Sequence, residues 1–368
     1  MTYTISIIKL VAFLDLLAVG LIVPLIPNHV RQMGGNQLYI GLLGSMYSGF
    51  QLGSGPLIGS LSDLKGCRNI LIYTLFICST AYVALGLTTS VIVIIILRAI
   101  LGLFKQTQLL TKALVPEYEK DEKKQSVIFG KMAAISGMGM TLGPVIGGHI
   151  AEDFPENGFF YISLIVATVF IVNAGCVNML PKTSIKINKN AVKKNPEHNF
   201  LQLIYSNSKQ SVEELAKVEW SQYWDVFMFK ALLGFSMGVY YSNYALYLKS
   251  QYDLTPKHVG YVISLQGLCL SYNIFIYTIW LVPMSIGNAV GRLVTLEMIL
   301  RKKDQEHKGT LIGASNSIAS LSGVLSPMVS GLIGHYMGVK YVIYASLASN
   351  VLALVLSYRY KTRHEKVE

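Results

Sequence analysis

Three charged side chains lie inside long apolar stretches of this 368-residue sequence, where a charge is costly unless it meets water or a partner. Asp15 lies in the first apolar run, and Arg98 and Lys105 are seven residues apart in the fourth. Seven residues make about two helical turns, so Lys112, one more such step along, should share their helix face. A carboxyl group beside cations can bind and release a proton, and the cations attract anions.

Two further polar side chains belong with this set. Gln108 follows in the same apolar run as Lys105, and Lys230 lies in a later one. With Asp15 as the one comparably deep acid of the first half, these cations predict a net positive cavity that favours an anionic or carboxylate-bearing ligand. Two interpretations of Asp15 stay open: it binds a proton, or it bonds the backbone near the end of its helix.

The composition places these residues in a membrane. Hydrophobic residues make up 52% of the chain and charged residues 14%, compared with about 25% charged in a soluble domain. Apolar runs long enough to span a bilayer recur along the chain, which predicts an all-α, multi-pass membrane protein. The net charge of +11 lies mostly in short loops beside these runs, where it indicates cytosolic loops, and we expect no nucleic-acid partner.

No pattern of catalytic or metal-binding residues accompanies the apolar runs. The four cysteines have no zinc-type spacing, and the sequence contains no Walker A, H-E-x-x-H or G-x-S-x-G motif. We therefore expect no enzymatic activity, no metal and no cofactor. An ion gradient remains as the source of energy for any work done across the membrane.

Hydropathy divides the chain into two halves. The first, 1–180, contains six predicted spans, and a polar stretch at 181–220 reads as a cytosolic linker. A shorter second half, 221–360, precedes a cytosolic tail at 361–368. Basic loops then fall on the cytosolic side, with both termini. The predicted spans are 4–27, 38–61, 70–88, 90–113, 127–150, 158–180, 223–249, a long run at 258–299, 309–333 and 338–358.

The two halves are repeats of one another. Pro144 matches Pro327 at a separation of 183 residues, whereas Gly41 matches Gly260 at a separation of 219. The second half is therefore shorter by roughly 36 residues, about one helix and a loop, which predicts roughly 10–11 spans. The long run at 258–299 exceeds one bilayer crossing, so we expect a break in it near Pro283.

Glycines concentrate in the fifth span, in the segment Gly139-Met-Thr-Leu-Gly143-Pro144-Val-Ile-Gly147-Gly148. Soluble helices rarely contain so many helix breakers, but membrane helices use them for close backbone packing. We interpret this segment as a packed bend that also acts as a hinge.

The loop after the second span reads Gly59-Ser-Leu-Ser-Asp63-Leu-Lys-Gly66-Cys67-Arg68. It resembles the G-x-L-x-D-x-x-G-R-R signature of the major facilitator superfamily, with Cys67 in place of the first arginine. The resemblance implies a cytosolic gate in which Gly66 permits a tight reversal and Asp63 accepts bonds from helix N-termini or from an arginine of the other half. A basic loop with a turn glycine would explain Arg68 but not the whole pattern.

Three other segments resemble the same superfamily. The fifth-span segment is similar to its G-x-x-x-G-P-x-x-G-G motif, which is associated with proton-coupled antiporters. The segment around Asp15 resembles the start of tetracycline-type efflux proteins, and Arg98-Ala-Ile-Leu-Gly102 resembles an R-x-x-x-G element credited with proton coupling.

The resemblance implies a fold of two six-helix repeats, here with the second shortened, and a monomeric secondary transporter. Such a protein would move a small organic solute, together with protons, by alternating access of a cavity between the halves. Because the second half is short, an alternative stays open: a non-transporting membrane scaffold or sensor, or an inactive truncated isoform.

Overall fold

The structure is a computed structural model that describes residues 2–181, 220–264 and 308–364. Within these ranges the regular elements are helices, and no strand occurs. The helices are α1 (Thr2–Ile22), η1 (Val23–Leu25), α2 (Ile26–Gln32), α3 (Gln37–Lys65), α4 (Cys67–Leu87), α5 (Val91–Phe104), α6 (Thr107–Tyr118), α7 (Glu122–Asp153), α8 (Gly158–Asn178), α11 (Trp220–Tyr252), α12 (Pro256–Ser264), α14 (Lys308–Tyr336) and α15 (Val339–His364).

The six spans predicted before residue 180 are all helical, and local sequence explains several of their ends. The Asn36 side chain caps α3 by accepting a hydrogen bond from the Tyr39 N–H at 3.1 Å. Gly66 separates α3 from α4 with φ +87°, a conformation that favours glycine. Pro24 lies in the short 3-10 turn between α1 and α2, where a proline interrupts α-helical hydrogen bonding.

The fourth predicted span differs from expectation. A continuous helix over 90–113 was the prediction, but α5 ends at Phe104 and α6 begins at Thr107. Lys105 has ψ +71° and leaves the helical conformation, and the Gln106 N–H donates to the Phe104 carbonyl instead of continuing the helical pattern. The prediction that Arg98, Lys105 and Lys112 share the face of one helix is therefore wrong, because the chain changes direction at Lys105.

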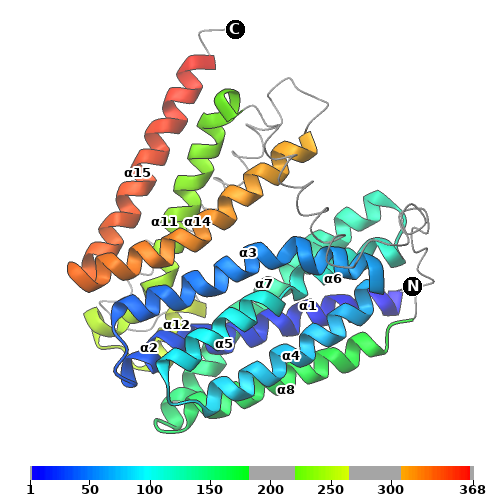
Figure 1. Cartoon of the computed structure of the whole chain (residues 1–368), viewed down its shortest axis with the longest axis horizontal. Helices are drawn as coiled ribbons and strands as arrows, with labels where there is room; N and C mark the ends of the chain where they lie inside the picture. Colours follow the sequence, from blue (N-terminus) through cyan, green and yellow to red (C-terminus); the bar gives the residue numbers. More distant parts are fainter. Residues whose placement is uncertain (1, 182–219, 265–307, 365–368) are drawn as a thin grey trace, which may run out of the picture.

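The described helices form two groups (Figure 1). Helices α1 to α8 pack together, with α7 and α8 against α1, α5 against α3, and α8 against α4. Helices α14 and α15 pack on α11 in the second group. The groups join where α14 lies along α3 and α12 lies along α7, and α11 and α15 extend away from the first group toward the C-terminus (Figure 1).

The two joints between the groups use the residues that the repeat analysis paired. A Cβ on Gly41 of α3 would come to 2.5 Å from the Pro327 carbonyl oxygen of α14 and to 2.8 Å from the Gly331 Cα. At the other joint, a Cβ on Gly260 of α12 would clash with the Pro144 carbonyl oxygen of α7. Equivalent glycines and prolines thus close both joints, as expected for two related halves.

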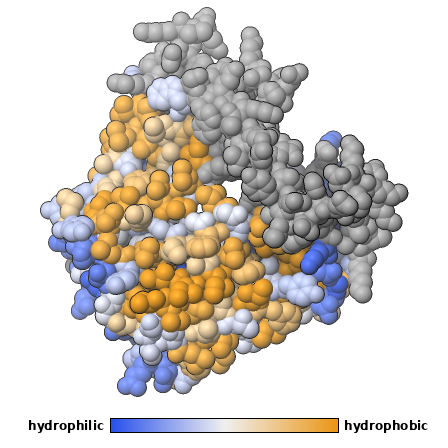
Figure 2. All heavy atoms as spheres, viewed as in Figure 1, coloured by the Kyte–Doolittle hydropathy of each residue, from blue (hydrophilic) through white to orange (hydrophobic). Residues whose placement is uncertain are grey.

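The outer surface matches a membrane environment. Apolar side chains form a broad band over α4, α5 and α8 in Figure 2, with hydrophilic residues at its two ends. Among the described residues, five segments are long and apolar enough to cross a bilayer: Tyr3–Gln32, Cys67–Leu87, Val91–Tyr118, Gly158–Asn178 and Val339–Leu356. Helices α3, α7 and α11 also have the length but contain more glycine, serine and other polar residues, and they pack between or within the two groups.

Several predictions fall outside the described residues. Most of the predicted linker lies in 182–219, and the tail lies partly in 365–368. The long apolar run begins in α12, but its continuation, with the expected break near Pro283 and the roughly 36-residue shortfall, lies in 265–307.

Candidate functional site

A buried ion pair occupies the interior of the first group. The Lys105 Nζ lies 3.0 Å from Asp15 Oδ1 and 3.2 Å from Oδ2, and the exposed fractions of the two residues are 6% and 0%. Gln108 Nε2 donates to Asp15 Oδ2 at 3.1 Å and to the Ala12 carbonyl at 3.4 Å. The Asp15 carboxylate therefore has one cationic and one neutral donor, which offset part of its desolvation.

The interruption between α5 and α6 brings Lys105 to this position. Its carbonyl accepts from Gln51 Nε2 of α3 at 3.2 Å, while its side chain points to Asp15 on α1. Gln106 Nε2 donates to the Gln51 carbonyl at 2.9 Å and to Ser54 Oγ at 2.8 Å. Polar groups of Gln51 and Ser54 on α3 thus form hydrogen bonds with the non-helical segment at Lys105 and Gln106. These bonds matter because the core of a membrane offers no water to the backbone.

Arg98 of α5 lies about two helical turns before Lys105 and has a different environment. Its guanidinium lies over the Tyr47 ring of α3 at 4.3 Å from the centroid, a cation–π geometry. The residue is 7% exposed, and its Nε has no hydrogen-bond partner among the described residues. A guanidinium without a full set of acceptors is a ready site for an anion.

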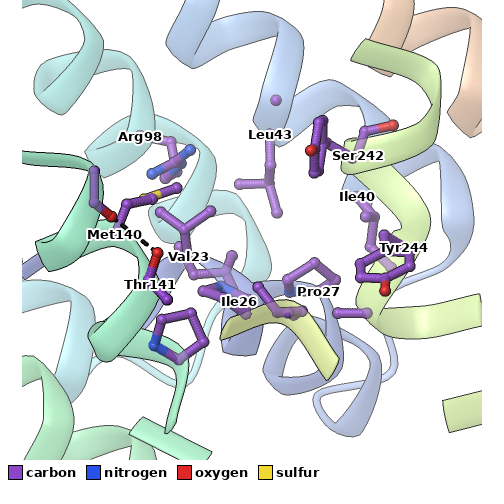
Figure 3. Close-up of a pocket in the computed structure, with 17 residues that line it drawn as sticks. Val23, Ile26, Pro27, Ile40, Leu43, Arg98, Met140, Thr141, Ser242 and Tyr244 are labelled. Carbon is purple, nitrogen blue, oxygen red and sulfur yellow. Dashed lines mark hydrogen bonds between the residues drawn. The ribbon is translucent and has the colours of Figure 1, made fainter. Parts of the chain in front are cut away.

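A cavity of about 720 Å³ lies beside Arg98 and is lined by residues of both groups (Figure 3). Most of the lining is apolar, with hydroxyls from Thr141, Ser242 and Tyr244, and Arg98 is the one charged residue among the described residues that line it. The lining consists of Val23, Pro24, Ile26, Pro27, Ile40, Leu43, Gly44, Arg98, Gly137, Met140, Thr141, Pro144, Tyr241, Ser242, Tyr244, Ala245 and Ile263.

The structure therefore divides the predicted cavity residues into two places. Arg98 lines the cavity, whereas Asp15, Lys105 and Gln108 form the buried cluster behind it. Lys230 of α11 is half-buried and does not line this cavity. Among the described lining residues Arg98 contributes the one cation, and the charge of Lys105 is paired with that of Asp15.

Sequence reasoning missed several lining residues. Met140 and Thr141 lie between the glycines of the fifth-span segment, which suggested packing alone, yet both face the cavity (Figure 3). Tyr47 and Gln51 also escaped notice, because a tyrosine and a glutamine on a membrane helix carry no motif. The available signal was their spacing: four residues on a helix bring both to the face that meets α5.

The fifth-span segment packs on two helices at once. A Cβ on Gly139 would come to 2.6 Å from the Phe13 carbonyl oxygen, and one on Gly143 to 2.6 Å from the Gly20 Cα, both on α1. Gly147 continues this face, with the Leu21 carbonyl as its neighbour. Pro144 and Gly148 face α12 instead, where a Cβ on Gly148 would lie 2.6 Å from the Pro256 carbonyl oxygen.

The structure describes part of the predicted gate loop. Arg68 binds the end of α8 in its own half: Nε donates to the Val177 carbonyl at 3.1 Å, and Nη2 donates to the Asn178 carbonyl at 2.6 Å and to Asn178 Oδ1 at 2.8 Å. A Cβ on Gly59 would meet no atom within 4 Å. The side chain of Asp63 is not among those that the structure describes.

Known proteins resemble this chain over most of its length. The family model described as Major Facilitator Superfamily matches residues 9–270. The class E tetracycline resistance protein of Escherichia coli is 25% identical over 360 residues, which cover 89% of this chain and 87% of that protein. The quinolone resistance protein NorA of Staphylococcus aureus is 23% identical over 261 residues, 70% of this chain and 61% of that protein.

Solved structures share the fold. A bacterial homologue of the human lysosomal transporter Spinster, in an inward-facing and occupied conformation, gives a TM-score of 0.73 at 12% identity, with 99% of this chain and 97% of that chain covered. The human organic anion transporter MFSD10 gives 0.60 at 17% identity, with 96% and 99% covered. Family model, motifs and fold agree, and the chain belongs to the Major Facilitator Superfamily of membrane transporters.

Proposed function

We propose that this secondary transporter moves a small organic anion, coupled to protons, by alternating access. The observation that carries the proposal is the position of Arg98, an under-coordinated cation in a cavity between the two groups whose described lining contains no other charged residue. A buried carboxylate and lysine lie behind it, in the same group of helices.

The cavity suits a ligand with an apolar body and one negative group. Its volume of about 720 Å³ is within the range of small-molecule sites. Apolar walls and the aromatic side chains of α11 bind by burial and stacking, while the guanidinium pairs with a carboxylate or similar group. A cationic ligand would meet Arg98 without any compensating acid among the described lining residues, at a Coulombic cost. The name of MFSD10, an organic anion transporter, is consistent with this substrate class.

The buried ion pair supports the coupling to protons. Protonation of Asp15 would leave the Lys105 ammonium buried without a counterion, which typically costs several kcal/mol. That cost favours a conformation in which Lys105 reaches water or an anion. Proton binding would in this way change the relative energies of the two access states.

The arrangement of the halves supports alternating access. The groups are joined at the contacts of Gly41 and Gly260, and the helices of the second group diverge from the first away from these joints (Figure 1). Rocking about the joints would open the cavity to either side in turn. The basic loops favour a cytosolic position for both termini, and the protein would act as a monomer without a cofactor.

Flux into proteoliposomes under a pH gradient tests the proposal. Organic anions should compete for the transported substrate, and neutralising Arg98 with Arg98→Gln should reduce uptake at least tenfold. Arg31→Gln, at an exposed arginine of α2, is the matched control and should leave flux unchanged. Competition by organic cations and not by anions would refute the substrate class, and intact proton-coupled uptake by Asp15→Asn would refute the proton assignment.

The shortened second half supplies the alternative, a non-transporting scaffold or sensor or an inactive truncated isoform. It rests on the shortfall of roughly 36 residues between the repeats. A transcript that encodes these residues after Leu265 would identify the chain as an isoform. Absence of flux for every anion tested, together with preserved folding, would favour the scaffold or sensor.

A further inference from the structure

Helix α3 contacts both the interrupted backbone at Lys105 and the second group of helices. Its face with Tyr47, Gln51 and Ser54 meets α5 and α6, since these residues follow a spacing of four and three. A neighbouring face carries Gly41 and Ser45, which contact α14. No motif of the superfamily quoted above includes Gln51 or Ser54.

The face toward α5 and α6 replaces helical hydrogen bonds that the interruption removes. The Gln106 N–H donates to the Phe104 carbonyl and not to the Gly102 carbonyl, as it would in a continuous helix. The Gly102 carbonyl accepts a hydrogen bond from Ser54 Oγ at 3.3 Å instead. Gln51 Nε2 supplies the Lys105 carbonyl at 3.2 Å. Each unsatisfied carbonyl in the core of a membrane would cost several kcal/mol, so these two side chains hold the interruption in place.

The same face connects the interruption to the cavity. Gln51 Nε2 also lies 3.3 Å from the hydroxyl of Tyr47, whose ring lies beneath the Arg98 guanidinium. Side chains of α3 thus contact both cations: the Tyr47 ring lies against Arg98 of α5, and Gln51 bonds the carbonyl of Lys105, between α5 and α6.

The face of α3 that contains Gly41, Gly44 and Ser45 fixes this helix to the other half. Ser45 Oγ donates to the Val324 carbonyl of α14 at 2.8 Å, and Gly41 and Gly44 lie against Pro327 closely enough that a Cβ on either would come within 2.7 Å of it. A backbone contact without intervening side chains cannot shear freely, so any rocking of α14 displaces α3 or breaks this joint.

We propose that Gln51 and Ser54 are positioning residues that hold Lys105 against Asp15, and that α3 transmits the movement of the second half to this ion pair. The inference rests on the proposed function for the role of the pair. Displacing α3 withdraws the amide and hydroxyl from the Lys105 and Gly102 carbonyls, the interruption refolds, and the distance from Lys105 to Asp15 increases. A carboxylate that loses its neighbouring cation protonates at a higher pH.

Infrared difference spectroscopy of the protein in lipid bilayers tests this without a substrate. The carboxylate stretching bands that disappear in Asp15→Asn at pH 7 report the contact of Asp15 with Lys105. Gln51→Met keeps the length and volume of the side chain but removes its donor, and should shift these bands because the carboxylate loses its cationic hydrogen-bond donor. Ser54→Ala, a second and smaller change, should shift them in the same direction. Gln32→Met, at an exposed residue of α2, is the control and should leave them unchanged.

The outcomes separate the inference from the proposed function. If both variants retain the wild-type band positions while the bands respond to Asp15→Asn, the positioning role is refuted and the proton assignment stands. If no Asp15-dependent carboxylate band appears, both are refuted. Loss of the shift in Gln51→Met when Lys105→Met is also present would confirm that Gln51 acts through Lys105.

Discussion

Gly41 of α3 and Pro327 of α14 touch backbone to backbone across the two halves, with space for hydrogen but not for a methyl group. Gly260 and Pro144 repeat the contact at the second joint, between α12 and α7. The protein therefore depends on the absence of a side chain at two equivalent places. Alanine at either glycine should separate the halves there.

We expect Gly41→Ala to shift the conformational equilibrium toward separation of the joint by roughly 1–3 kcal/mol, because the methyl group would lie 2.5 Å from the Pro327 carbonyl oxygen. Double electron–electron resonance between labels at the exposed positions Gln32 and Lys340 would measure the separation. Gly53→Ala on the same helix is the control, since a Cβ there meets no atom within 4 Å. An unchanged distance distribution for Gly41→Ala would contradict the prediction.

The buried ion pair predicts a strongly non-additive double-mutant cycle. Asp15→Asn should lower the free energy of unfolding by about 3–5 kcal/mol, because it leaves the Lys105 ammonium buried and unpaired. The double variant Asp15→Asn/Lys105→Met should lose much less, since it removes both charges.

Chemical denaturation in detergent micelles would measure this cycle, and the chain provides a control pair on its surface. Lys124 Nζ and Asp121 Oδ2 lie 3.9 Å apart, with side chains 68% and 47% exposed. Asp121→Asn should change stability by less than about 1 kcal/mol. Equal losses for the single and double variants at Asp15 would show that the two charges do not depend on each other.

Glu152 at the end of α7 predicts a pH-dependent contact between the halves. A hydrogen bond from Thr255, followed by the Lys257 N–H and nearby positive charge, lowers the pKa of this carboxyl below its usual value of 4.5. Glu152 Oε2 accepts the Lys257 N–H at the start of α12, at 3.1 Å. A lowered pKa means that the contact is fully present above pH 4.5 and is lost as the pH falls through the lowered value.

The distance between labels at Glu156 and Asp253 should therefore stay constant from pH 7 down to pH 4.5 and increase only as the pH falls further, through the lowered pKa of Glu152. Glu152→Gln should increase it already at pH 7, since a neutral amide is a weaker acceptor. Asp153→Asn, at the neighbouring exposed acid, should behave as wild type. A transition near pH 6 in the wild-type protein would assign the effect to histidine instead.

We expect that restoring the paired arginines of the superfamily motif, by replacing Cys67 with arginine, destabilises this protein. The thiol is 3% exposed, and Sγ donates to the Leu110 carbonyl of α6 at 3.1 Å. Cys67→Arg would place a much larger, charged side chain in this buried space, and should lower the thermal midpoint and the yield of folded protein. Cys67→Ser keeps the size and the donor and should be tolerated; normal stability of Cys67→Arg, by thermal unfolding, would contradict the packing argument.

Much of the architecture was predictable because apolar runs and repeated glycines record helix position and packing. The match of Gly41 with Gly260 and of Pro144 with Pro327 anticipated two equivalent joints before any contact was known. Hydropathy did not locate the break at Lys105, because apolar residues resume at Leu109 after the short polar run 105–108 and no proline marks the interruption. Tertiary hydrogen bonds from α3 stabilise that break, and they leave no local signal.

The residues of the site were predictable, but their division between the cavity and the buried ion pair was not. A lysine and an arginine seven residues apart predict one shared cavity only while the helix continues. Once α5 ends at Phe104, Lys105 turns to Asp15, and Arg98 alone faces the open space. Charges within one apolar run therefore identify the functional region, whereas the local backbone decides which of them remain available to a ligand.

The lower hydropathy of α3, α7 and α11 has a consequence for how the chain is synthesised. Segments such as Tyr3–Gln32 and Gly158–Asn178 are apolar enough to enter the lipid directly from the translocon. The helices with more glycine and serine gain less from lipid and depend on finished neighbours, as α7 does on α1 and α3 does on α14. Their integration should lag behind their synthesis until a partner helix is in place, so the order of membrane insertion need not follow the order of translation.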